Sequence, residues 1–219
     1  CFEKNPHVAV GVSGGPDSIA LVYLISNWIK SKNGKLSALI FDHRIRVNSE
    51  QESFQVRDIL IDLNINARIL KTKKNKPIKK NMAHARSNRF EGLITFCKKY
   101  YIHHLFLGHH FDDNLETFLI RKINGSNFEG LNSMEEITYL KKIQILRPFI
   151  KINKNSILSF NKKNKLVFVN DPSNNDINFT RVKVRKFLQN NKYKKLIKHD
   201  FIILKKEMPY YRDMVWKCL

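Results

Sequence analysis

The sequence predicts an α/β protein built on a Rossmann-like, doubly wound parallel sheet, followed by a small basic helical annex. Strand-like and helix-like segments alternate through the first half of the chain, which implies βαβ units with helices on both faces of one sheet. After Pro148 this alternation weakens, and basic helical segments follow. We therefore expect a nucleotide-binding domain over residues 1–150 and a mainly helical extension over residues 151–219 that completes the site and contacts RNA.

The individual elements follow from local periodicity. His7–Val12 alternates small and β-branched residues and is expected to be a buried strand, and Ile19–Ile29 has apolar residues at helical spacing. The other expected strands are Lys35–His43, Ile65–Leu70 and Ile102–His110, and the other expected helices are Ser49–Leu63, Met82–Tyr100 and Asp112–Ile123. Lys71–Asn81 is basic, contains a proline and lacks periodicity, so we expect a surface loop, with contact to an RNA backbone as the alternative.

The charge of the chain favours a polyanionic partner. The 219 residues include 40 Lys and Arg and 19 Asp and Glu, which gives a formal net charge of +21. Such a field attracts nucleic acid. The alternative is compositional drift, because Lys, Asn and Ile, which have AT-rich codons, are abundant together.

The cysteines and the hydropathy pattern indicate which classes of protein are excluded. The three cysteines, Cys1, Cys97 and Cys218, are far apart and form no Cys-x-x-Cys pair. This pattern argues against a disulfide framework, an iron–sulfur cluster or a structural metal, and it fits a reducing cytoplasm. We expect no membrane span, because no apolar run approaches about 20 residues, and no stable protein partner is implied.

The segment 13–18, Ser-Gly-Gly-Pro-Asp-Ser, joins the first strand to the first helix and is the sharpest motif. Its glycines let the backbone approach an anion closely, and the positive end of the helix dipole faces the same point. The segment matches neither the Walker sequence nor the three-glycine dinucleotide fingerprint. The alternative is an ordinary strand-turn-helix corner in which a Ser or Asp caps the helix.

Four other polar motifs lie at strand ends or on helices. Asp42, His43 and Arg46 follow the second strand, where turn capping is the alternative role. Arg86 and Arg89 are three residues apart on one helix and can hold phosphates, although two arginines on an exposed helix face are common.

The motif "LGHHFDDNLET" follows the fourth strand. Asp113 and Glu116 have the spacing of a capping box, which would explain both carboxylates but leaves His109 and His110 unexplained. An imidazole and a carboxylate at this edge of a sheet are suited to proton transfer.

The last motif is "NDPSNNDINFTRVKVR". It combines a turn, Asp171–Asn175, with Arg181 and Arg185, which are four residues apart on a helix. These arginines either contact RNA or a triphosphate, or lie on a solvated helix face.

Taken together, the motifs resemble a known family. The words "SGGPDS", "DHRIR", "ARSNRF", "LGHHFDDNLETFLIR", "NGSNFEGLNSM", "RPF" and "DPSNNDINFTRVKVR" occur in the order and approximate spacing of the tRNA(Ile)-lysidine synthetases, which are PP-loop ATP pyrophosphatases of the N type. The resemblance implies ATP-dependent attachment of free L-lysine to C2 of the wobble cytidine in tRNA(Ile) with the anticodon CAU. The cytidine is adenylated first, and AMP and pyrophosphate are released.

The same resemblance implies roles for individual residues. Arg86 and Arg181 would contact phosphates or the activated base, His109 and Asp113 would orient the base and amine or carry the proton, and Glu116 would help to hold lysine. Asp17 would meet Mg²⁺. The residues that would bind ATP are Ser13, Gly14, Gly15, Pro16, Asp17 and Ser18.

Three other functions stay open from the sequence. A tRNA thiolase of the same superfamily would need a cysteine pair or cluster. An amidating enzyme resembling GMP or NAD synthetase would act on small molecules and would not need a strongly basic surface. A domain that only binds RNA or ATP is the third alternative.

Overall fold

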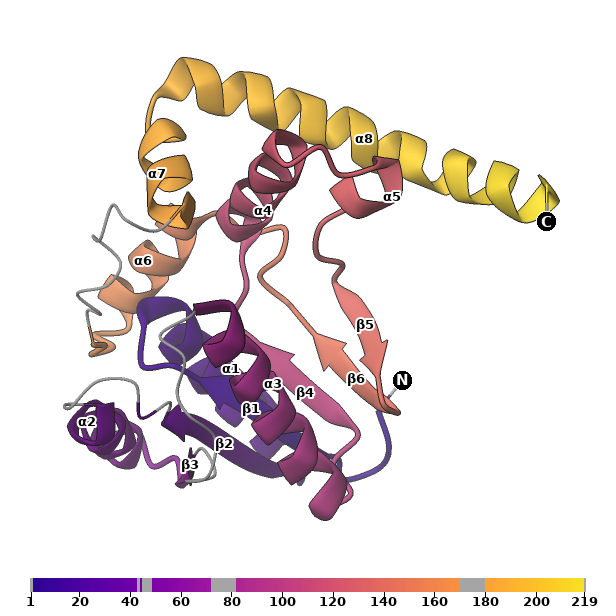
Figure 1. Ribbon diagram of the computed structural model, residues 1–219. Coiled ribbons are helices and arrows are strands. Elements are labelled where there is room, and N and C mark those ends of the chain that lie inside the picture. The colour runs from indigo at the N-terminus through magenta and orange to yellow at the C-terminus, as the bar shows by residue number, and fades with distance from the viewer. Residues whose placement is uncertain (1, 43, 45–48, 72–81, 170–179, 219) are drawn as a thin grey trace. The chain divides into compact units, whose positions relative to one another are not determined.

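The computed structural model describes residues 2–42, 44, 49–71, 82–169 and 180–218 (Figure 1). Its strands are β1 (His7–Val12), β2 (Lys35–Asp42), β3 (Ala67–Lys71), β4 (His104–Leu107), β5 (Ile137–Leu140) and β6 (Ile143–Leu146). Its helices are α1 (Pro16–Ser31), α2 (Ser49–Asp62), α3 (Met82–Lys99), α4 (Phe111–Ile123), α5 (Phe128–Leu131), α6 (Lys154–Lys163), α7 (Thr180–Phe187) and α8 (Asn191–Cys218). Of the sequence predictions, His43, Arg46, the loop over 72–81 and the turn Asp171–Asn175 lie outside the described residues.

The expected α/β fold is confirmed. The six strands form one sheet in the order β3-β2-β1-β4-β6-β5, in which every neighbouring pair is parallel except β5 and β6. The strand order reverses direction beside β1, because the chain continues to β2 on one side and later returns to β4 on the other. Ligands of doubly wound sheets bind at such a switch point, at the carboxyl ends of the strands.

Alternation along the strands directs side chains into two cores, one on each face of the sheet. Val8, Val10 and Val12 pack with buried residues of α1, α2 and α6. Ala9 belongs to the opposite core, where α3 contributes Leu93 and its neighbours. Helices therefore cover both faces, as the βαβ pattern predicts.

The β5–β6 hairpin was not expected from the sequence. Its strands have four residues each and are joined by Lys141 and Lys142, whose φ angles are +50° and +68°. Positive φ at both central residues is typical of a type I′ turn, which usually contains Asn-Gly or Asp-Gly. Two lysines give no such signal, so the hairpin was missed.

The contacts divide the chain into two compact units, and each contains two stretches of sequence. Unit 1 consists of Cys1–His109 and Glu136–Asn170, and unit 2 consists of His110–Glu135 and Asp171–Leu219. Unit 1 therefore contains the sheet with α1, α2, α3 and α6, and unit 2 contains α4, α5, α7 and α8. The boundary expected at residue 150 stays a prediction.

Unit 2 has a hydrophobic core of its own. Phe118 on α4 and Phe201 on α8 are both buried, and their ring centroids are 5.3 Å apart. Val184 and Leu188 pack into the same cluster, so α7 is attached to α4 by apolar contacts. Within the described residues, no helix is long and apolar enough to cross a membrane.

Candidate active site

The glycine loop of unit 1 connects β1 to α1 and is held by hydroxyl contacts. The Ser13 backbone N–H donates to Ser18 Oγ at 3.1 Å, and Ser18 Oγ donates to the Gly15 carbonyl at 3.0 Å. Gly15 is the N-cap residue of α1, and no side chain caps this helix. The two serines therefore shape the loop itself, and the alternative of an ordinary capped corner does not describe it.

Gly14 occupies a place that no other residue fits without strain. Its φ angle is +84°, in the left-handed region, and a Cβ there would lie 2.3 Å from Cγ2 of Val56 on α2. Close packing against α2 and the left-handed turn thus both require glycine. The N-terminus of α1, which is the positive end of its dipole, follows directly.

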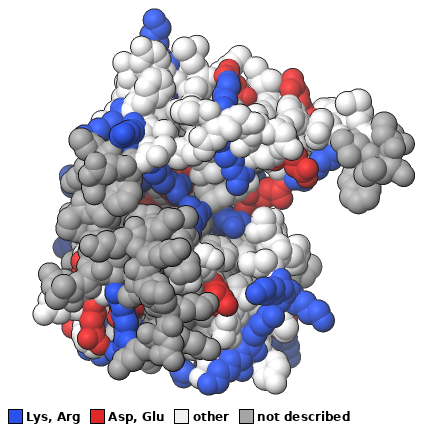
Figure 2. All heavy atoms as spheres, in the orientation of Figure 1, with Lys and Arg blue, Asp and Glu red and all other residues white. Residues whose placement is uncertain are grey.

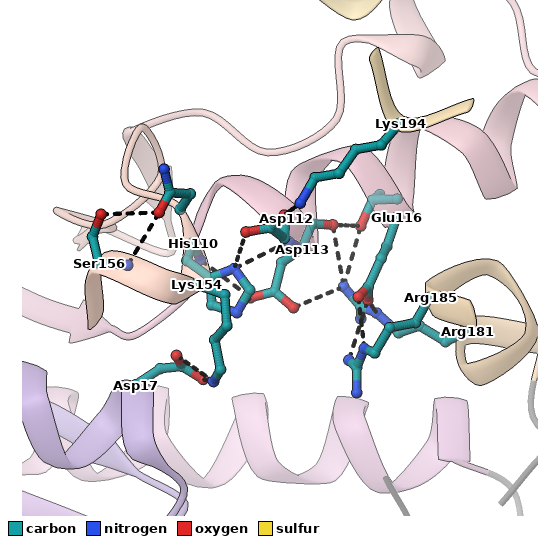
Figure 3. A network of polar contacts seen from close by, with 12 residues as sticks. Asp17, His110, Asp112, Asp113, Glu116, Lys154, Ser156, Arg181, Arg185 and Lys194 are labelled. Carbon is teal, nitrogen blue, oxygen red and sulfur yellow. Dashed lines mark hydrogen bonds and ion pairs between the residues drawn. The ribbon is translucent and has the colours of Figure 1, made fainter. Parts of the chain in front are cut away.

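Asp17 lies in the first turn of α1 and has a partner that the sequence did not suggest. Lys154 Nζ lies 2.6 Å from Asp17 Oδ1 and 2.7 Å from Oδ2 (Figure 3). Lys154 is the first residue of α6, and it is 137 positions away in the chain. A single lysine in a basic segment carries no signal for such a contact, so only the fold reveals the pair.

The end of β4 packs tightly against the same turn. A Cβ at Gly108 would lie 3.1 Å from the carbonyl carbon of Asp17 and 3.2 Å from the backbone nitrogen of Ser18. This small residue lets the strand end approach the start of α1, as expected for neighbouring strands at the switch point. His109, which follows Gly108, is partly exposed.

The loop offers one ligand of the type that magnesium prefers. Mg²⁺ usually binds through one or two carboxylates together with substrate phosphates and water. The Asp17 carboxylate has the right chemistry and is partly exposed, with a side-chain exposure of 23%. In the described part of the chain, no group of three or more His, Cys, Asp or Glu is placed to hold a metal ion.

In unit 2, the start of α4 corrects one sequence interpretation. His110 is the N-cap residue: its Nδ1 accepts from the Asp113 backbone N–H at 3.3 Å, and Asp113 Oδ2 accepts from the His110 N–H at 3.1 Å. The capping box therefore joins His110 to Asp113 and not Asp113 to Glu116, because the helix begins at Phe111. This contact also explains His110, which the sequence left without a role.

Glu116 is the centre of an ion-pair cluster in unit 2. Its side chain is 4% exposed, and its two oxygens accept from Arg181 Nε and Arg185 Nε, each at 2.8 Å (Figure 3). Arg181 Nη2 also lies 3.3 Å from the carbonyl oxygen of Asp113. The expected spacing of the two arginines on one helix is confirmed, and both guanidinium groups face α4.

A third cation completes this cluster. Lys194 Nζ on α8 lies 2.5 Å from Asp112 Oδ1. Three carboxylates of α4, those of Asp112, Asp113 and Glu116, thus face three cations from α7 and α8. These contacts fix which way the acidic side chains of α4 point.

The "NGSNFEGLNSM" segment of unit 2 is held by contacts to its C-terminal half. Asn114 on α4 exchanges two hydrogen bonds with the Met134 backbone, at 3.0 and 2.8 Å, and Arg121 Nη1 donates to the Gly130 carbonyl at 2.6 Å. Lys205 on α8 donates to the Asn132 carbonyl and to Asn132 Oδ1. Burial lowers the pKa of Lys205, against the opposing effect of nearby Glu135. The segment is therefore a fixed part of unit 2.

The remaining expected residues lie elsewhere in unit 1. Asp42 is buried and accepts from the Arg44 backbone N–H at 2.9 Å, in agreement with the turn-capping alternative. Arg86 is exposed on α3. On the face in Figure 2, Lys and Arg side chains appear at several separate places on the surface.

The fold is similar to that of a solved structure. The structure of the U34-tRNA thiolase NcsA from Methanococcus maripaludis, with its [4Fe-4S] cluster, superposes with a TM-score of 0.74 at 19% sequence identity. The match covers 90% of this chain and 74% of that one. At this identity the likeness concerns the fold alone.

Sequence similarity then defines the family. The model of the PP-loop domain matches residues 2–192, and the chain belongs to this family. It is 35% identical over 189 residues to the tRNA(Ile)-lysidine synthase of Orientia tsutsugamushi (strain Boryong). This alignment covers 86% of this chain and 42% of that protein. The tRNA(Ile)-lysidine synthase of Bradyrhizobium diazoefficiens is 32% identical over 189 residues, with coverage of 85% and 52%. The chain thus spans about half the length of these relatives.

Proposed function

We propose that the protein is a tRNA(Ile)-lysidine synthase, which uses ATP to attach L-lysine to C2 of the wobble cytidine of tRNA(Ile) with the anticodon CAU. One observation carries the proposal. The similarity to enzymes with this name extends beyond the glycine loop over about 85% of the chain, at 30–35% identity. It therefore includes the parts of unit 2 that a generic ATP-binding domain would not need.

The chemistry requires activation of a poor electrophile. The O2 atom of cytidine attacks the α-phosphorus of ATP, and pyrophosphate leaves. The ε-amine of lysine, after losing a proton, attacks C2 and displaces AMP. Steps of this kind depend on positioning and on stabilisation of developing negative charge.

In this proposal unit 1 binds the nucleotide. The loop from Ser13 to Ser18 presents backbone N–H groups and the positive end of α1 to the phosphates. The geometry at Gly14 supports this role, because the left-handed turn at this glycine leads directly into the start of α1. Mg²⁺ would bind through Asp17 and add positive charge at the phosphates, and Arg86 would supply a further cation.

The segment 109–116 and α7 provide the acid–base and charged groups in this proposal. His109 and Asp113 orient the base and the amine or carry the proton. Both oxygens of Glu116 accept from arginines, so its first role is to hold Arg181 and Arg185. A lysine amine that binds Glu116 would share the carboxylate oxygens with these two arginines.

The thiolase alternative gains no support from the described thiols. Cys97 is the one cysteine whose side chain is described; it lies on α3 and is buried in the core, and burial raises the pKa of its thiol to about 12. A thiol of this kind is not a nucleophile at neutral pH.

The test is ATP-dependent transfer of radiolabelled lysine to a tRNA(Ile) transcript with the anticodon CAU. A transcript with U in place of C34 and an elongator methionine tRNA are the controls. Label on the first transcript alone is the expected result. Absence of label, in a preparation that still binds ATP, would reject the proposed reaction.

Variants then test the residue roles. His109→Ala and Asp113→Ala should lose lysine transfer and keep ATP binding. A variant of exposed Lys142, in the β5–β6 turn, should transfer lysine normally. Unchanged transfer by both site variants would reject the assigned roles.

A further inference from the structure

We propose that Lys154 is a phosphate ligand that holds Asp17 in the nucleotide-free protein. When ATP binds, Lys154 donates to a phosphate oxygen and Asp17 becomes available to the accompanying cation. The inference rests on the proposed use of ATP, and it assigns a function to a residue that no sequence motif marks.

The exposure of the ion pair argues for exchange. Lys154 Nζ contacts both Asp17 oxygens at 2.6 and 2.7 Å, yet 32% of the Lys154 side chain and 23% of the Asp17 side chain are exposed. Because both side chains are partly exposed, water screens part of the attraction between the two charges. Other charged groups can therefore reach the pair and compete for its partners.

Helix stability does not explain a lysine at this position. Asn153 caps α6 by accepting from the Ser156 backbone N–H at 3.1 Å, and Lys154 is the first helical residue. A positive charge there adds to the positive end of the helix dipole and is unfavourable. The first turn of α6 contains no acidic residue that would offset it. The contact with Asp17 is a favourable interaction of this ammonium group.

The glycine loop and the α6 region are fixed to each other by further hydrogen bonds. Asn161 Nδ2 donates to the Pro16 carbonyl at 2.9 Å, and the Val169 N–H donates to the Gly14 carbonyl at 2.9 Å. Asn161 is almost completely buried. These bonds hold the backbone of α6 beside the loop. The Lys154 side chain can therefore change its conformation while its backbone stays in place.

The negative charge of Asp17 in the glycine loop favours a cation close to it. A carboxylate in the first turn of α1 repels the phosphates of a nucleotide that binds at the same helix terminus. A divalent cation removes this repulsion when it is present, and Lys154 removes it when the cation is absent. The Lys154 ammonium should therefore matter most for nucleotide binding without Mg²⁺.

The experiment compares Lys154→Met and Lys154→Arg with wild type, and uses Lys151→Met as the matched control. Lys151 is in the same segment, and its side chain is 79% exposed and paired with Glu136 at 2.6 Å. The affinity for α,β-methylene-ATP is measured by calorimetry with Mg²⁺ and with EDTA, and adenosine is the ligand without phosphate. Thermal unfolding of each variant shows whether the fold is kept.

We expect Lys154→Met to weaken binding of the analogue by about tenfold or more in EDTA, and by less with Mg²⁺, while the melting temperature stays near that of wild type. Lys154→Arg and Lys151→Met should bind like wild type, and adenosine affinity should not change. Equal affinity of Lys154→Met and wild type in both conditions would overturn the inference. So would an equal loss for adenosine, because adenosine offers no phosphate. If wild type itself fails to bind the analogue, the proposed use of ATP is wrong.

Discussion

Replacing Gly14 by alanine should destabilise the protein through two separate effects. The residue has a φ angle of +84°, and a Cβ at this position would lie 2.3 Å from Cγ2 of Val56. The first effect is the strain of a side chain in the left-handed region. The second is a steric overlap with a side chain that is itself buried at 3% exposure.

The size of the loss follows from these two effects. A left-handed conformation costs a non-glycine residue about 1–2 kcal/mol, and overpacking a core costs roughly 1–3 kcal/mol. Together they lower the free energy of unfolding by about 2–5 kcal/mol. For a chain of this length each kcal/mol changes the melting temperature by about 2–4 °C. Differential scanning calorimetry and urea unfolding measure the change.

Two other glycines separate the effects. Gly15→Ala should be nearly neutral, because its φ is −70° and its nearest neighbour, Ser13 Oγ, would be 3.8 Å away. Gly125→Ala tests conformational strain alone, since φ is +69° and nothing lies within 4 Å. Val56→Ala, combined with Gly14→Ala, should recover the steric part.

The outcomes discriminate between these reasons. If Gly14→Ala costs no more than Gly125→Ala, the overlap with α2 is not significant. If it costs no more than Gly15→Ala, the whole argument for a glycine requirement is refuted.

Three further predictions follow from charge and burial. With Cys1 and Cys218 replaced by serine, the native Cys97 thiol should react with iodoacetamide far more slowly than the unfolded protein at about pH 8, because burial raises its pKa to about 12. Burial acts to raise the pKa of Glu3, but hydrogen bonds from its own backbone and from a histidine outweigh it, so the pKa lies below the ordinary value. The stabilisation by Glu3 is then complete above the ordinary pKa and is lost as the pH falls through the lowered one, which urea midpoints at about pH 7 and about pH 3.5 should show. Glu116→Gln should lower the free energy of unfolding by roughly 1–3 kcal/mol, because two arginines lose a charged acceptor.

Each of these has its own control. Rapid alkylation of the folded single-cysteine protein would contradict the burial argument. Glu3→Gln should be less stable than wild type near neutral pH and nearly equal to it in acid; a constant difference would show that the carboxylate charge is irrelevant. Exposed Glu207→Gln is the comparison for Glu116→Gln, and equal effects of the two would mean that the arginine contacts contribute nothing.

The glycine loop and the main βα elements could be predicted because their signals are local. The run from His7 to Val12 and the helical spacing after it are patterns of neighbouring residues, and β1 and α1 form there. Boundaries were less accurate: α1 begins at Pro16 rather than Ile19, and β4 ends at Leu107 rather than His110. Helix starts depend on capping geometry, which periodicity does not contain.

Contacts between distant segments were not predictable. No sequence pattern pairs Lys154 with Asp17, because lysines are abundant and the position of each ammonium group depends on where its helix begins. The capping partner of Asp113 also depends on the residue at which α4 begins. Because α4 begins at Phe111, His110 is its N-cap residue.

The amino-acid sequence by itself determined the α/β class, the phosphate-type loop after β1, the basic charge and the two arginines at helical spacing, since each is a property of composition or of adjacent residues. Only the tertiary structure decided what these groups contact. Arg181 and Arg185 face Glu116, and Asp17 faces Lys154, because packing of α7 on α4 and of α6 on α1 brings together side chains that are far apart in the chain. Local periodicity specifies which elements form, but partner choice depends on long-range packing, which a local pattern does not encode.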